Sequence, residues 1–343
     1  MKPRQAWIDC AKVISICLVV SYHIPPRPDG MFGEFIRLLR MPAFFLIAGY
    51  LFNASRFPTL TGFLRHRSRQ LLIPYVTFFV LFYALWLLFG RAMAGDEQAL
   101  LTPLWEFVTG RPSTVVATYW FIACLFTLQI LYWLLGRIVP RRWLFPTCVL
   151  LSLLGVVPGM PTVWNIDNAF RYLPFYAFAN CYKEFVGALR FRSHAPRVVL
   201  MLAMSIGLLV VRQLLPADGL LPNIADHLCF IGGGLLLLPA YICLCKGLGD
   251  LIGHRQFIEV TGRNTILILA CQNYLIGLIK LAADKVSGTA DKVSGTADSL
   301  ECLPWLNIPL TLLIIAVMYP VALLVERYAP WMAGRPRPKT DKP

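Results

Sequence analysis

Apolar runs of about 16–22 residues, the length that crosses a bilayer as one helix, recur along the whole chain. This feature constrains the fold more than any other, because soluble domains rarely repeat such runs. The composition agrees, since 57% of the 343 residues are hydrophobic and only 15% are charged. We predict ten spans, approximately at 7–24, 35–53, 71–90, 115–136, 144–158, 173–189, 198–215, 227–246, 264–282 and 305–325.

The predicted fold class is all-α: a polytopic transmembrane bundle of about ten helices around a central pore. The first run is not a cleavable signal, because it contains Asp9 and Lys12 and lacks a small-x-small cleavage site. No polar stretch is long enough to form an independent soluble core. We therefore expect one membrane domain over 1–328, followed by a disordered, proline-containing cytoplasmic tail at 329–343.

The distribution of Lys and Arg predicts which side of the membrane each loop faces. With ten alternating spans and a cytoplasmic amino terminus, twenty of the 32 basic residues fall in inner segments and eight in outer segments. This bias satisfies the positive-inside rule, so both termini are predicted to be cytoplasmic. The net charge of +14 is dispersed over separate loops, which argues against a nucleic-acid partner. Nine of the ten cysteines lie in or beside apolar runs, so we expect no metal site and no disulfide framework.

Three ionisable residues lie in the first apolar run. Lys12 and His23 are eleven residues apart, which is three helical turns and a small remainder, so they share one helix face about 16 Å apart along the axis. Asp9 precedes Lys12 by three residues on that face. Such groups are expensive in lipid, and we expect them to face a protein interior or a water-filled pore. An imidazole there can take a proton from a hydroxyl and return it. The simpler alternatives are an interfacial His23 and a snorkelling or Asp9-paired Lys12.

Other polar residues have both a structural and a functional interpretation. Arg65, Arg67 and Arg69 precede a span, where they are either a topological signal or guanidinium groups that capture phosphate. Trp120 stands near the start of the fourth span, where aromatic residues commonly anchor a helix at the interface. Arg40 directly precedes a stretch with a proline, two phenylalanines and a glycine that favours close helix packing.

Several of these residues belong to ordered segments of the chain: Trp7-Ile8-Asp9-Cys10-Ala11-Lys12 with Val19-Val20-Ser21-Tyr22-His23, Met41-Pro42-Ala43-Phe44-Phe45 through Gly49-Tyr50-Leu51-Phe52, Arg67 through Leu71-Leu72-Ile73-Pro74-Tyr75, Tyr119-Trp120-Phe121, and Gly262-Arg263-Asn264-Thr265-Ile266. In order and spacing they resemble the acyltransferase-3 family of integral-membrane acyltransferases. The closest likeness is to its branch of fucose 4-O-acetylase-like enzymes and polysaccharide O-acetyltransferases.

The resemblance implies an enzyme in a bacterial inner membrane that moves an acetyl or other short acyl group. The donor would be cytoplasmic acetyl-CoA, and the acceptor a hydroxyl of an extracytoplasmic glycan or polysaccharide precursor. It assigns catalysis to His23 with Asp9 and binding of the donor to Lys12, Arg65, Arg67 and Arg69. Arg40, Trp120 and Gln272 are then candidates for acceptor binding. The acceptor sugar, the acyl group, direct transfer versus transient acylation of His23, and the oligomeric state, including a homo-oligomer, stay open.

The chain departs from the family pattern at three positions. Arg40 and Gln272 stand where the branch often has histidine, and Gln70 replaces the second arginine of an Arg-x-x-Arg that begins at Arg67. If the replaced histidines contact the acceptor, the sugar, the hydroxyl or the activity itself differs from the branch. The competing functional class is a glycan or lipid transporter that uses His23 and Lys12 as a proton relay.

Overall fold

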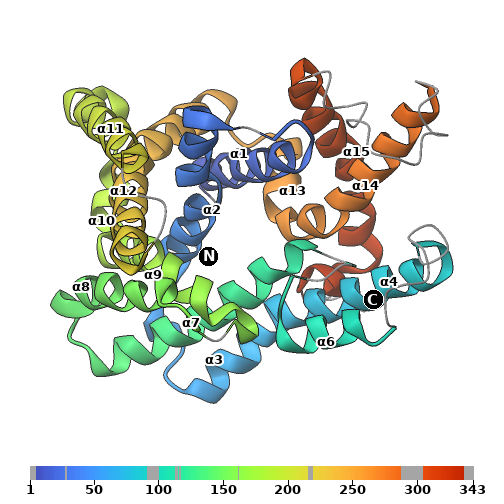
Figure 1. The fold of residues 1–343 in the computed structure, drawn as a ribbon, viewed down its shortest axis with the longest axis horizontal. Helices are drawn as coiled ribbons and strands as arrows, with labels where there is room; N and C mark the ends of the chain where they lie inside the picture. The colour runs from blue at the N-terminus through green and yellow to red at the C-terminus, as the bar shows by residue number, and fades with distance from the viewer. Residues whose placement is uncertain are drawn as a thin grey trace, which may run out of the picture. The chain divides into compact units, whose positions relative to one another are not determined.

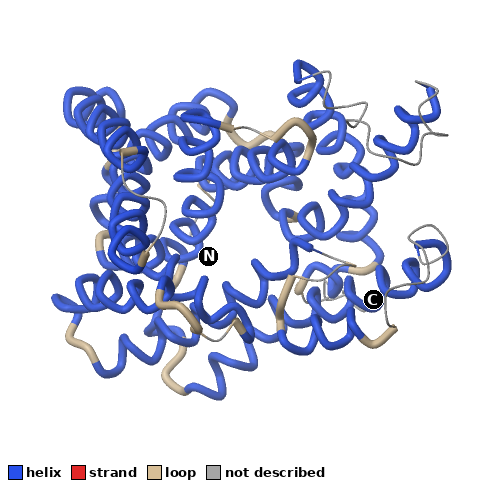
Figure 2. The backbone as a smooth tube through the Cα atoms, in the orientation of Figure 1, coloured by secondary structure: helices blue, strands red, loops and turns tan. Residues whose placement is uncertain are grey.

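The computed structural model describes residues 5–27, 29–90, 100–112, 115, 117–160, 162–214, 219–286 and 304–335. The backbone of these residues is helical throughout, with short turns and loops and no strand (Figure 2). The α-helices are α1 (Ala6–His23), α2 (Gly30–Leu51), α3 (Leu60–Arg67), α4 (Ile73–Leu85), α6 (Thr102–Thr109), α7 (Trp120–Ile138), α8 (Arg141–Ser152), α9 (Ile166–Cys181), α10 (Lys183–Ala188), α11 (Phe191–Gln213), α12 (Leu220–Ile252), α13 (Gln256–Arg263), α14 (Thr265–Val286) and α15 (Asn307–Tyr328).

Shorter helical turns connect these elements. Two are π-helical, η2 (Ser68–Leu72) and η3 (Trp86–Gly90). The 3-10 turns are η1 (Ala54–Arg56), η4 (Ala117–Tyr119), η5 (Leu153–Val156), η6 (Val163–Asn165), η7 (Pro304–Leu306) and η8 (Pro330–Ala333).

Seven helical stretches among the described residues are long and apolar enough to cross a membrane: Ala6–His23, Leu60–Leu88, Ala117–Ile138, Phe191–Gln213, Leu220–Ile252, Thr265–Ala282 and Asn307–Tyr328. Each coincides with one of the ten predicted runs, so the all-α transmembrane class is confirmed. The other three predicted runs are also helical, but each has a feature that sets it apart. The run at 35–53 contains two arginines, the run at 144–158 includes a helix of only 12 residues, and the run at 173–189 is divided at Tyr182.

The chain divides into two compact units, each built from separate stretches of sequence. The first unit combines Met1–Tyr50 with Phe178–Ala322, and the second combines Leu51–Ala177 with Leu323–Pro343. In the first unit α1 packs against α12, α13 and α14, and α11 lies along α12 (Figure 1). This arrangement buries one side of α1 within the first unit, including Asp9, and leaves Lys12 and His23 partly exposed.

Two glycines let neighbouring helices approach the backbone of α1. A Cβ atom at Gly249 of α12 would lie 2.8 Å from the backbone nitrogen of Trp7, and one at Gly262 of α13 would lie 3.1 Å from the Cα of Asp9. The middle of α1 is fixed by hydrogen bonds, since the Tyr241 hydroxyl contacts the Ser15 hydroxyl at 2.8 Å and donates to the Ala11 carbonyl at 2.5 Å. Close packing and buried hydrogen bonds together hold α1 in a single position within its unit.

The second unit packs aromatic side chains around α7. Tyr132 and Trp133 of α7 contact Phe52 and Phe63, and the Arg137 guanidinium donates to the Phe57 carbonyl at 2.8 Å. The predicted tail at 329–343 begins in this unit with η8, which packs against α4 and buries Pro330. Residues 336–343 of that tail lie outside the described residues.

Candidate functional site

His23 is the last residue of α1, and the chain leaves the helix directly after it. Ile24 has an extended backbone, and Pro25 and Pro26 cannot donate the hydrogen bonds that would continue the helix. The carbonyl groups left at this end are satisfied by Asn307, whose amide donates to Ser21 at 2.9 Å and to Ile24 at 3.0 Å. The first residue of α15 therefore fixes the end of α1 from which the imidazole projects.

Two arginines surround the aromatic neighbour of His23. The Arg40 guanidinium lies 3.4 Å from the centroid of the Tyr22 ring, and that of Arg27 lies 5.5 Å from the same centroid. The Tyr22 ring contacts the imidazole edge-on, with 5.7 Å between centroids. Both guanidinium charges act on His23. The imidazole thus lies in a positive field, which favours any negative charge that develops beside it.

Arg40 was predicted from the sequence as a binding residue, whereas Tyr22, Arg27 and Asn307 were not. A signal for Arg27 was present, because it follows His23 by four residues after two prolines that turn the chain back. Asn307 had no comparable signal, since it is 286 residues from Ser21 in the sequence. Only the packing of α15 brings it to the end of α1.

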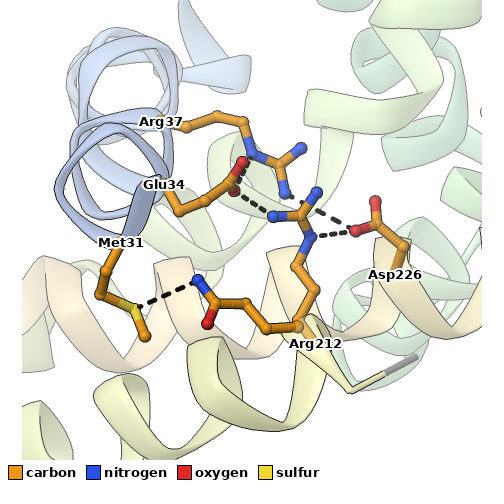
Figure 3. Close-up of polar contacts among 6 residues, drawn as sticks. Met31, Glu34, Arg37, Arg212 and Asp226 are labelled. Carbon is orange, nitrogen blue, oxygen red and sulfur yellow. Dashed lines mark hydrogen bonds and ion pairs between the residues drawn. The ribbon is translucent and has the colours of Figure 1, made fainter. Parts of the chain in front are cut away.

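A cluster of four charged side chains joins α2, α11 and α12 in the same unit (Figure 3). Arg212 binds both Glu34 and Asp226, and Arg37 donates to Glu34 at 2.8 Å and lies 3.8 Å from Asp226. All four side chains are 22–36% exposed, so water screens them in part. Two cations and two anions cancel, so the cluster ties three helices together without adding net charge.

Asp9 and Lys12 lie far from His23 along α1. Asp9 is 4% exposed and lies against Gly262 of α13, while Lys12 is partly exposed. Fourteen helical residues separate Asp9 from His23, a rise of about 21 Å. Asp9 and His23 therefore cannot form a direct dyad, and Asp9 can influence the reaction only through its neighbours.

Gln272 is completely buried on α14, one of the helices that pack against α1. Among the described residues, neither its side-chain nitrogen nor its side-chain oxygen has a hydrogen-bond partner. Leaving a buried donor and acceptor unpaired costs about 1–3 kcal/mol each. An amide in this state is suited to bind a hydroxyl group or water.

The predicted site residues of the second unit do not share one environment. Arg65 and Arg69 are exposed, but Arg67 is largely enclosed and donates to the side chain of Gln70 at 2.9 Å. The Arg67 guanidinium lies 5.6–5.8 Å from the centroids of three aromatic rings, those of Phe52, Phe57 and Phe63. Cation–π contacts and the Gln70 bond thus position Arg67 within its unit. Trp120 packs with the rings of Phe121 and Tyr172.

The chain was compared with families, curated proteins and solved structures. No curated protein and no solved structure matches it. A family model described as an acyltransferase domain matches residues 5–327, which is nearly the whole chain and includes segments of both units. That match agrees with the seven apolar helices of spanning length found among the described residues. The chain therefore belongs to the acyltransferase-3 family of membrane acyltransferases.

Proposed function

We propose that this protein is a membrane O-acyltransferase that moves an acetyl or other short acyl group from cytoplasmic acyl-CoA to a hydroxyl of an extracytoplasmic glycan or polysaccharide precursor. The observation that carries the proposal is the acyltransferase family match over residues 5–327. The fucose 4-O-acetylase-like branch, ten spans, cytoplasmic termini and a bacterial inner membrane are parts of the same proposal. They rest on the ordered segments and on the distribution of Lys and Arg.

His23 serves as the general base in this proposal. Its imidazole removes the proton from the acceptor hydroxyl while the hydroxyl oxygen attacks the thioester carbonyl. The new C–O bond forms, the C–S bond breaks, and the thiolate of CoA leaves with the proton that the imidazolium returns. Base catalysis of this kind contributes about 10²–10⁴-fold. Arg27 and Arg40, close to Tyr22 and acting on His23, favour the negative charge of the tetrahedral intermediate.

The remaining predicted residues are assigned to donor and acceptor. Lys12 stands eleven residues before His23 on α1, where a fixed cation attracts an anionic donor entering from the cytoplasm. Arg65, Arg67 and Arg69 provide guanidinium groups for phosphate. Gln272, buried with an unpaired amide among the described residues, is assigned to the acceptor, and the resemblance assigns Arg40 and Trp120 to it as well, each within its own unit.

Reconstitution in liposomes tests the proposal directly. Purified protein should consume acetyl-CoA and form an O-acetyl ester on a glycan placed on the opposite side of the bilayer. Thiol release measures the donor, and mass spectrometry of the glycan measures the product. Movement of a glycan or lipid without loss of the thioester, together with proton uptake, would instead identify a transporter that uses His23 and Lys12 as a relay.

The acceptor can be identified in cells that carry the gene. Mass spectrometry of surface polysaccharide from a deletion strain should show the loss of a single acyl substituent. Return of that substituent with the wild-type gene, and not with a His23→Ala gene, would link the residue to the modification. Unchanged polysaccharide in the deletion strain would contradict a glycan acceptor.

A further inference from the structure

A cavity of about 390 Å³ lies within the first unit, at the end of α1 opposite to His23. Its lining includes Trp7, Tyr50, Gly187, Arg190, Lys246 and Asp250. None of these residues was predicted as a site residue from the sequence, and none contributes to the arrangement around His23. We call this cavity the Trp7 pocket.

Two aromatic rings and two glycines shape the Trp7 pocket. The rings of Trp7 and Tyr50 meet edge-on with 5.2 Å between centroids. Gly187 lines the wall, and a Cβ atom there would lie 3.6 Å from the Tyr50 hydroxyl, so the missing side chain leaves space beside that ring. Gly249 is required for a different reason, because a Cβ atom there would clash with the Trp7 backbone. The pocket thus presents the partly exposed Trp7 ring beside open space, with the buried Tyr50 ring packed edge-on against it, a shape that accepts a planar ring.

The positive charge of the pocket comes from two residues with different roles. Lys246 is 2% exposed and donates to the carbonyls of Val186, Gly187 and Leu189 at 2.6–2.9 Å. These bonds use its three donors but leave its charge in place, 5.3 Å from the Trp7 ring. Arg190 is half exposed and binds Asp250, another lining residue, at 2.5 Å through one nitrogen. The carboxylate balances the charge of Arg190, but the remaining guanidinium N–H groups can still donate to a ligand.

We propose that the Trp7 pocket binds the nucleotide end of the acyl-CoA donor, with the base against Trp7 and Tyr50 and a phosphate toward Arg190. The inference rests on the proposed acyltransferase function, but it moves recognition of the donor nucleotide from Arg65, Arg67 and Arg69 of the second unit to the first unit. Aromatic rings take a planar base, and the remaining N–H groups of the Arg190 guanidinium can donate to phosphate. A lipid headgroup or free phosphate would use the cations and leave the rings without a role.

The position of the pocket fits the geometry of transfer. Trp7 and His23 are sixteen residues apart on α1, a rise of about 24 Å. A donor anchored by its nucleotide at one end of this helix must present its thioester at the other, and acyl-CoA has a long, thin arm between these two groups. Recognition of the nucleotide at the Trp7 pocket is thereby separated in space from acyl transfer at the His23 imidazole.

Two donors in the reconstituted protein test the inference. Acetyl-CoA carries the nucleotide, whereas S-acetylpantetheine carries the same thioester and arm without it. Trp7→Ala should raise the KM for acetyl-CoA by about 10–100-fold, the usual worth of one base–aromatic contact, and leave turnover of S-acetylpantetheine unchanged. Trp143→Ala, which removes an exposed tryptophan of the second unit, should leave both donors unaffected.

A second variant covers the case in which Trp7→Ala does not fold. Gly187→Ala adds a methyl group at ordinary contact distance from Tyr50, so the fold should tolerate it while the pocket narrows. It should also raise the KM for acetyl-CoA selectively. In wild-type protein, adenosine 3′,5′-bisphosphate should inhibit use of acetyl-CoA, and Arg190→Gln should weaken that inhibition.

The outcomes separate the inference from the function on which it rests. If wild-type protein consumes neither thioester, the acyltransferase function itself fails. If it consumes both, and the two pocket variants change both donors equally or not at all, the pocket does not recognise the nucleotide. If the Trp7→Ala effect appears only in vesicles that contain anionic lipid, the pocket holds a lipid headgroup instead.

Discussion

The two ends of α1 both collect cations, but they use them differently. At the Trp7 end, Lys246 is buried and directs its charge to backbone carbonyls beside an open pocket. At the His23 end, Arg40 stacks on Tyr22, and Asn307 closes the helix. One end therefore has a cavity whose lining histidine, His254, contacts the Glu259 carboxylate, and the other has the His23 imidazole in a positive field.

The comparison teaches that positive charge alone does not mark a functional site in this fold. Lys246 contacts the last carbonyls of α10, and Arg40 lies near the last residues of α1, so each cation stands where a helix dipole favours it. The two ends differ in the group beside the cation, which is the Trp7 pocket at one end and the His23 imidazole at the other. We assign binding of the donor to the Trp7 end and chemistry to the His23 end.

The largest expected effect is the loss of catalysis at the His23 end. His23→Ala should lower acyl transfer by about 10²–10⁴-fold, because it removes the only proposed general base. Expression and the midpoint of thermal unfolding should not change, since His23 is partly exposed at a helix end. Acyl transfer by purified protein in liposomes measures the effect.

His194→Ala is the matched control for this prediction. His194 is an exposed histidine of α11 whose ring contacts the Arg190 carbonyl at 3.1 Å. Its replacement should leave turnover at the wild-type rate. Substantial turnover by His23→Ala protein would remove His23 from the mechanism. The His23 end of α1 would then have no assigned role in acyl transfer to set against the Trp7 end.

The next effect concerns the structural role of Lys246. Lys246→Met keeps a chain of similar length but leaves the carbonyls of Val186, Gly187 and Leu189 without their donor. We expect a loss of about 3 kcal/mol in the free energy of unfolding, since charged hydrogen bonds are worth about 1.5–3 kcal/mol each and water compensates part of the loss. Thermal unfolding in detergent measures it.

Lys246→Arg sharpens the interpretation of that loss. Guanidinium also donates to carbonyls, so this variant should recover part of the stability of the wild type. If Lys246→Met unfolds at the wild-type midpoint, the carbonyl contacts contribute nothing to stability. The Lys246 ammonium of the wild type would then be available to bind a ligand. The two ends of α1 would use their cations in a more similar way.

Helix packing at the Trp7 end gives a third, smaller effect. Gly249→Ala places a methyl group 2.8 Å from the Trp7 backbone nitrogen, too close without movement of α1 or α12. Overpacking of this kind costs about 1–3 kcal/mol. The unfolding midpoint should fall, and the KM for acetyl-CoA should rise because Trp7 moves with the helix.

Gly247→Ala, two residues away on α12, provides the control. No atom lies within 4 Å of its added methyl group, so no clash arises. Alanine is the better helix former by roughly 0.5–1 kcal/mol, and this variant should be as stable as the wild type or slightly more so. Equal destabilisation by both variants would show that helix propensity, and not contact with α1, governs the response.

The sequence predicts the local features of this molecule well. Apolar runs locate both ends of α1 and the start of α14 to within one residue, because a spanning helix satisfies its backbone within one segment, whereas α14 continues four residues beyond its predicted end. The two prolines after His23 predict the end of α1. The family match over residues 5–327 agrees with the resemblance drawn from the ordered segments.

Features that depend on contacts distant in sequence could not be predicted. Asn307 reaches Ser21 and Lys246 reaches Val186 only after the helices have packed. The Trp7 pocket likewise joins residues of α1, α2, α10 and α12, none of which indicates a cavity alone.

The smallest expected effect lies in the charged cluster of the first unit (Figure 3). Arg212→Gln leaves Glu34 and Asp226 with Arg37 as the remaining cation of the cluster. Because the side chains are 22–36% exposed, the loss in stability should be only about 0.5–1 kcal/mol and should shrink further as salt screens the charges. Unfolding midpoints at low and high ionic strength measure the size of the stability loss and its dependence on salt. A loss that is large and independent of salt would show that the cluster acts as a desolvated network, and positive charge in this unit would then contribute to the fold as strongly as Lys246 does.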